Sequence, residues 1–146
     1  MTLLLTAIVI GVVAYGFIRA DPARNPAPTA YVDAACTALD RLAATIDALG
    51  AAVEEGVADV AAEELADQAE AEALAADESL GTLPEWPPGE PLDELLAGML
   101  LDSLNAIVAI RDGELETARD DHESAANALA AAEASLANGR YGFDCD

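Results

Sequence analysis

Lysine is absent from this sequence, and only six arginines offset 28 aspartate and glutamate residues, so the formal net charge is −22. Proteins that bind nucleic acid concentrate lysine and arginine against the phosphate backbone. The composition therefore excludes nucleic acid as a partner, and it disfavours adsorption to anionic lipid headgroups for the same reason. Aromatic residues are also scarce, at 4% of the chain, which predicts an alanine- and leucine-rich core.

Catalytic and metal-binding residue sets are missing as well. His122 is the single histidine, whereas a zinc site needs several histidine or cysteine ligands and a nucleophilic site needs a positioned serine or cysteine. Ser124 lies two residues away, on a different helix face, so we interpret His122 as a partly buried structural residue. The acidic residues lack a calcium-loop pattern and predict a solvated face; the main ones are Glu54, Glu55, Glu63, Glu64, Glu70 and Glu72. We expect no catalytic, cofactor or metal site and no enzymatic activity.

Only one long uncharged apolar run is present, at residues 1–18. Eighteen helical residues span about 27 Å, close to the hydrocarbon thickness of a bilayer. A cleaved signal peptide would need a basic start and a small residue at position −3, and this segment has neither. Residues 1–20 are therefore predicted to be a retained, single-pass transmembrane anchor. Gly11 and Gly16 are small enough to let this helix pack closely against another, although their spacing is not that of a GxxxG motif.

The two cysteines, Cys36 and Cys145, help to predict on which side of the membrane the helical domain lies. One disulfide in a small chain indicates an oxidising compartment outside the cytoplasm, whereas two unrelated buried thiols are the alternative. Arg19 and Arg24 follow the apolar run, and the positive-inside rule would place that flank in the cytoplasm. We favour the disulfide and an extracytoplasmic domain.

Beyond the anchor, the chain divides into a spacer and a helical domain. Residues 21–29 are rich in proline, which predicts a stiff, extended spacer, with Thr29 as the cap of the first helix. Residues 30–146 form the acidic helical domain. Apolar residues recur there at intervals of three and four, predicting helices over 30–49, 57–78, 91–111 and 114–138. Gly50 and Gly56 predict a turn or kink.

A loop rich in proline and glycine at residues 81–91 separates the two halves. It contains Leu83 and Trp86, the only tryptophan, which are candidate partner-contact residues because a rigid loop exposes an aromatic anchor at little entropic cost. In the alternative interpretation, Trp86 folds back and closes the end of the core.

Two architectures fit this pattern. The first is an up-down-up-down bundle of four helices, with a turn at Gly113, Asp112 capping the last helix, and Cys36 meeting Cys145 at one end. The second is an antiparallel coiled-coil hairpin of two helices, 30–79 and 91–138. The wide apolar face of residues 92–110 favours the bundle.

The small residues from Ala106 through Gly113 to Ala125 resemble half of a tetratricopeptide-type helix–turn–helix. The bulky positions of that repeat are missing and no 34-residue period exists, so we interpret the stretch as a helical hairpin.

These features predict a non-catalytic accessory or scaffolding subunit. Its extracytoplasmic domain would dock onto other membrane or envelope proteins. One alternative is a filament or coat subunit that self-associates through its apolar N-terminal helix. Another is a viral lysis-type coiled coil of the cell envelope.

Overall fold

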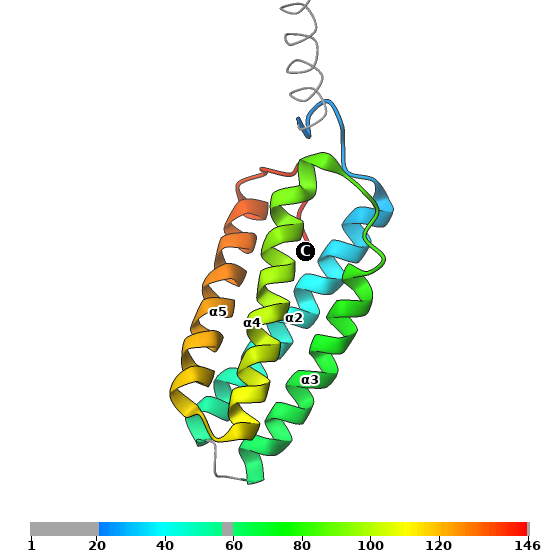
Figure 1. The fold of residues 1–146 in the computed structure, drawn as a ribbon. Helices are drawn as coiled ribbons and strands as arrows, with labels where there is room; N and C mark the ends of the chain where they lie inside the picture. The colour runs from blue at the N-terminus through cyan, green and yellow to red at the C-terminus, as the bar shows by residue number, and fades with distance from the viewer. Residues whose placement is uncertain (1–20, 57–59, 146) are drawn as a thin grey trace, which may run out of the picture.

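The computed structural model describes residues 21–56 and 60–145, which contain four long helices and no strand. A short 3-10 turn, η1, occupies Pro87–Gly89. The helix bounds are Thr29–Glu55 for α2, Val60–Leu80 for α3, Glu90–Asp112 for α4 and Leu115–Ala137 for α5. Successive helices run in opposite directions, so the start of α2 and the end of α5 lie at the same end of the domain (Figure 1). The predicted four-helix bundle is confirmed, and the two-helix hairpin is wrong.

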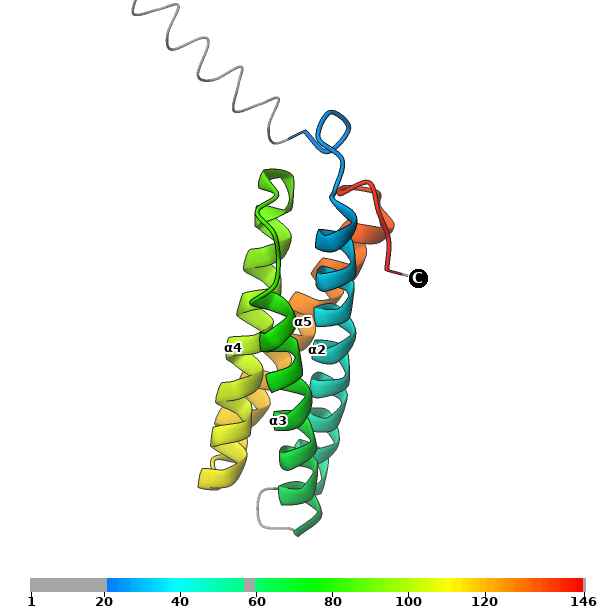
Figure 2. The same ribbon diagram turned by 90° about the vertical axis from the view of Figure 1, so that its right-hand side faces the viewer.

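The helices pack mainly as two antiparallel pairs, α2 with α3 and α4 with α5. Both α2 and α4 also contact each of the other helices, whereas α3 and α5 lie at the outer corners. Figure 2 shows the four helices side by side along the length of the domain. The apolar stretch at residues 92–110 contacts all three other helices, as expected, but its wide apolar face is covered only in part, because Leu101 and Val108 are 59% and 57% exposed.

Alanine forms most of the contact surface on the outer helices. The five buried residues of α3 are all alanines at alternating spacings of four and three: Ala62, Ala66, Ala69, Ala73 and Ala76. The leucines of α3 contribute less, since Leu74 is 60% exposed and Leu65 is only partly buried. A stripe of methyl groups lets two helix backbones approach closely, which accounts for the extensive packing of α3 against α2.

Glycines with a left-handed backbone follow the C-terminal ends of both α4 and α5. Gly113 has φ +79° after the last residue of α4, and Gly139 has φ +67° after α5. Two backbone N–H groups after α4 and three after α5 bond back to carbonyls of the last helical turn, which is the glycine cap typical of helix ends. The turn at Gly113 is confirmed. The predicted caps are wrong, because neither Asp112 at the α4–α5 turn nor Thr29 at the start of α2 provides a side-chain cap.

The first helix is longer than the sequence pattern indicates. It passes through Gly50 without interruption and ends at Glu55, followed by the cap residue Gly56, whose φ is +89°. Gly50 faces α5, where a Cβ atom at Gly50 would lie 3.1 Å from Nε2 of His122. The missing side chain makes room for the partly buried His122, so this glycine permits helix contact and marks no turn.

The segment before α2 is folded back on the domain, which corrects the expectation of an extended spacer. The backbone N–H groups of Arg24 and Asn25 both bond to the carbonyl of Asp21, at 3.0 and 2.9 Å. The carbonyl of Asn25 in turn accepts a hydrogen bond from the indole of Trp86 at 2.9 Å. This bond attaches the proline-rich segment to the bundle instead of letting it stand clear.

No helix among the described residues is long and apolar enough to cross a membrane. The predicted anchor at residues 1–20, with Gly11 and Gly16, lies outside the described residues.

Candidate functional site

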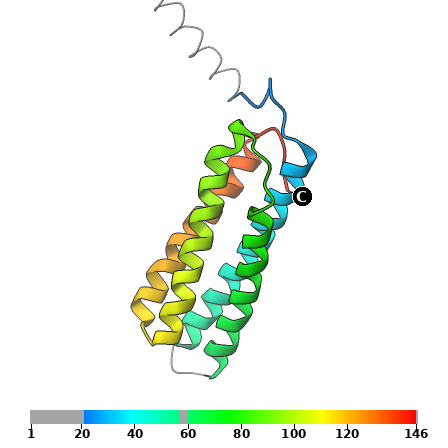
Figure 3. The same ribbon diagram turned by 45° about the vertical axis from the view of Figure 1, so that its right-hand side comes forward.

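All four aromatic side chains that follow residue 20 gather at the end of the bundle where α2 begins: Tyr31, Trp86, Tyr141 and Phe143. We call this set the aromatic cluster. Its closest pair is Tyr31 and Trp86, with ring centroids 4.7 Å apart. The loop after α3 climbs to this end before α4 starts (Figure 3), which brings Trp86 from the middle of the chain to residues from both ends.

Trp86 lies inside this cluster. Its side chain is 3% exposed, and its indole N–H is bonded to the carbonyl of Asn25. The indole therefore closes the end of the core, as in the alternative interpretation. Leu83 is partly buried against the same core.

The two tyrosine hydroxyls of the aromatic cluster differ in their hydrogen bonding. The Tyr31 hydroxyl donates a hydrogen bond to Oδ1 of Asp93 at 2.6 Å, whereas the buried Tyr141 hydroxyl has no partner among the described residues. Burial raises the pKa of Tyr31 well above its usual range, and the Asp93 carboxylate adds to this shift. Burial likewise raises the pKa of Asp93, although the bond from Tyr31 opposes it.

The C-terminal residues 138–145 cross from α5 to α2 over this end, and we call them the C-terminal strap. Cys145 is joined to Cys36 of α2 by a disulfide with a Cα–Cα distance of 5.3 Å. The predicted disulfide is present, and it fixes the strap to the second turn of α2. Phe143 and Tyr141 reach the aromatic cluster from the strap.

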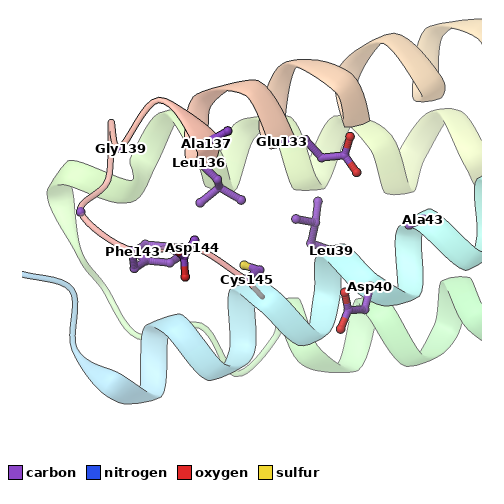
Figure 4. Close-up of a pocket in the computed structure, with 11 residues that line it drawn as sticks. Leu39, Asp40, Ala43, Glu133, Leu136, Ala137, Gly139, Phe143, Asp144 and Cys145 are labelled. Atoms are coloured by element: carbon purple, nitrogen blue, oxygen red, sulfur yellow. The ribbon is translucent and has the colours of Figure 1, made fainter.

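An open groove lies between α2, α5 and the C-terminal strap, with a volume of about 630 Å³. We call it the α2–α5 groove (Figure 4). Leu39 from α2 and Leu136 from α5 point into the space between the two helices. Its remaining lining residues are Asp40, Ala43, Glu133, Ala137, Gly139, Gly142, Phe143, Asp144 and Cys145.

Carboxylates stand on every wall of the α2–α5 groove. Asp40 comes from α2, Glu133 from α5 and Asp144 from the C-terminal strap, and all three are exposed. None of them forms an ion pair within residues 21–56 and 60–145. Arg41 and Arg111 instead pair with acidic residues of α3. Leu39 and Leu136 are each only 7% exposed, so the groove combines a largely buried leucine floor with an acidic rim that has no paired cation among the described residues.

The described part of the chain has no group of three or more histidine, cysteine or acidic residues that could hold a metal ion. Comparison with protein-family models, curated proteins and solved structures finds no match to this chain.

The sequence singled out the loop at Trp86 and Leu83 as the partner-contact region and did not identify the α2–α5 groove. The floor and rim of the groove come from two helices and the strap, and most of the domain separates Leu39 from Asp144 along the chain. The one sequence signal for this groove was the cysteine pair, because a Cys36–Cys145 bond places the C-terminal strap beside α2.

Proposed function

We propose that this protein is a membrane-anchored, non-catalytic docking subunit whose helical bundle binds a partner protein in the α2–α5 groove. The observation that carries the proposal is the groove itself. It has a volume of about 630 Å³ and is open to solvent between two helices and the C-terminal strap. Residues 1–20 provide the anchor in this proposal.

Placement of the bundle outside the cytoplasm is also proposed. The Cys36–Cys145 bond supports it, because disulfides persist in oxidising compartments and are rare in the cytosol. The segment before α2, drawn in blue, lies at the same end of the bundle as the C-terminal strap (Figure 1). A partner bound in the α2–α5 groove would therefore sit near the end of the domain that faces the anchor.

Site-specific photocrosslinking in the cells that make the protein tests the docking role. A photoreactive residue would replace Ala43 or Ala137, which line the groove, or the controls Ala44 and Ala131, which lie on the same two helices outside it. We expect one partner protein to be captured from both groove positions and from neither control.

Adducts of equal yield at all four positions would contradict a groove-specific partner. Adducts formed only with a second copy of the chain would favour the self-associating filament or coat subunit instead. Removal of residues 1–20 tests the anchor separately: the shortened chain should leave the membrane fraction, and continued membrane association would argue against it.

A further inference from the structure

We infer that the α2–α5 groove takes a basic amphipathic helix of the partner protein, with an apolar face between Leu39 and Leu136 and arginine or lysine side chains against the acidic rim. This inference rests on the proposed docking function and adds the chemistry of the ligand. Three features support it: the shape of the groove, the distribution of its carboxylates and the way the C-terminal strap forms one wall.

The shape of the groove favours a helix as the occupant. The described residues contain no strand, so an incoming segment has no sheet edge to extend. The floor is a pair of leucines contributed by two helices, each 7% exposed, and the more accessible apolar positions beside them are the small residues Ala43 and Ala137. An apolar floor between two helices accepts side chains that recur at three, four and seven residues along a third helix.

Charge selects a basic partner and disfavours a second copy of this chain. Asp40, Glu133 and Asp144 line the groove from α2, α5 and the C-terminal strap without a paired cation among the described residues. The only cation on the strap, Arg140, is held 5.7 Å from the ring centroid of Tyr141 and does not line the groove. Another copy would bring a further net charge of −22, whereas a cationic helix would be attracted to the rim.

The C-terminal strap makes the groove depend on the disulfide. Five of the eleven lining residues belong to it: Gly139, Gly142, Phe143, Asp144 and Cys145. Cys145 is bonded to Cys36, so this wall is held against α2 by a covalent bond. Reduction would release the C-terminal strap together with Asp144, which is one of the three carboxylates of the groove. The affinity of the groove for the partner helix should therefore fall.

Binding of designed peptides to the full-length protein in detergent tests the inference. A labelled 18-residue helical peptide would carry leucines along one face and arginines on both flanks, and its matched control would carry glutamine in place of arginine. Fluorescence anisotropy at low and physiological salt gives the affinities. We expect the arginine peptide to bind about tenfold more tightly than the glutamine peptide, with a smaller difference at higher salt, because exposed ion pairs each contribute modestly and are screened.

Two sets of variants separate the rim from the overall charge of the chain. Asp40→Asn, Glu133→Gln and Asp144→Asn together should weaken the arginine peptide about five- to tenfold. The matched set Asp47→Asn, Asp120→Asn and Glu123→Gln removes three exposed acids outside the groove and should change affinity less than about twofold. Ala137→Trp should block the groove, while Ala131→Trp should not, and circular dichroism would verify that each variant is folded.

Equal binding of the two peptides, or equal loss in the two charge sets, would overturn the inference. Competition by spermine as effective as that by the arginine peptide would indicate a site for small cations and would overturn it too. Failure here is distinguishable from failure of the docking function. A partner crosslinked at Ala43 and Ala137 through a neutral or acidic segment would retain docking while overturning the basic helix.

Discussion

The Tyr31 hydroxyl bonds to the Asp93 carboxylate at 2.6 Å and so joins the first turn of α2 to the first turn of α4. These helices are not consecutive in the chain, and the contact lies at the end of the bundle where Trp86 and the C-terminal strap also meet. This end is held together by side chains from the start, the middle and the end of the domain.

Removing one hydroxyl from each buried tyrosine should have opposite effects. Tyr31→Phe leaves Asp93 without its hydrogen-bond donor and should destabilise the fold by about 1–3 kcal/mol. Tyr141→Phe removes a buried hydroxyl that has no partner among the described residues and should be neutral or stabilising by up to about 1 kcal/mol. Thermal or denaturant unfolding of the two variants measures the contrast. Destabilisation by Tyr141→Phe as large as that by Tyr31→Phe would contradict it.

Asp93→Asn should stabilise the protein at neutral pH and have no such benefit in acid. Burial and the neighbouring Glu90 raise the pKa of the folded Asp93 above its unfolded value, so its contribution to stability is greatest below the unfolded pKa and is lost as pH rises through the folded pKa. Asparagine keeps an acceptor for Tyr31 without the charge. Unfolding free energies at pH 7 and at about pH 3, below the unfolded pKa of aspartate, test this; an advantage of equal size at both values would refute the assignment.

Two glycines near the start of α4 should respond oppositely to alanine. A Cβ atom at Gly89 would overlap the rings of Tyr31 and Trp86, and Gly89→Ala should cost about 1–3 kcal/mol through overpacking. Gly98 lies inside α4, and a Cβ atom there would project into open space, with nothing within 4 Å. Gly98→Ala should therefore stabilise the helix by up to about 1 kcal/mol. Melting temperatures of the pair check both signs, and a lower melting temperature for Gly98→Ala would contradict the prediction at that position.

Reduction of the Cys36–Cys145 bond should lower the melting temperature markedly while leaving most helix intact in the cold. The bond spans 109 residues, and the chain-entropy model assigns about 4–5 kcal/mol to a loop of this length, a large fraction of the roughly 5–15 kcal/mol typical of a domain. Thermal circular dichroism with and without reductant measures the effect. The double variant Cys36→Ser and Cys145→Ser is the control, because added reductant should leave its melt unchanged.

The sequence pattern predicted the helices, their order and the disulfide because each depends on local or covalent signals. Helix periodicity placed most boundaries within a few residues, and Gly113 marked a turn that requires a left-handed backbone. The prediction of a turn or kink at Gly50 was wrong because a glycine within a helix can have two different effects. It weakens an isolated helix, but here it also makes room for His122 of a neighbouring helix, and that neighbour is visible only in the folded chain.

Long-range packing accounts for the other differences. The buried face of α3 consists of alanines, whereas its leucine Leu74 is exposed, so large apolar residues do not identify the contact surface of this helix. Trp86 was placed in a loop correctly, but its burial depends on Tyr31, Tyr141 and the carbonyl of Asn25. The α2–α5 groove combines residues from three segments, and no local pattern in any one of them indicates its apolar floor or acidic rim.

The position of the disulfide also determines how the domain would respond to a pull along the chain. Tension applied between the segment before Thr29 and the C-terminus reaches Cys36 after only the first seven residues of α2, because the covalent loop begins there. From Cys36 the force passes directly to Cys145 and leaves α3, α4 and most of α2 and α5 unstretched. If the bundle were held at its N-terminal segment and pulled at its C-terminal strap, only the first two turns of α2 would unfold. The rest of the domain would transmit the force without extending.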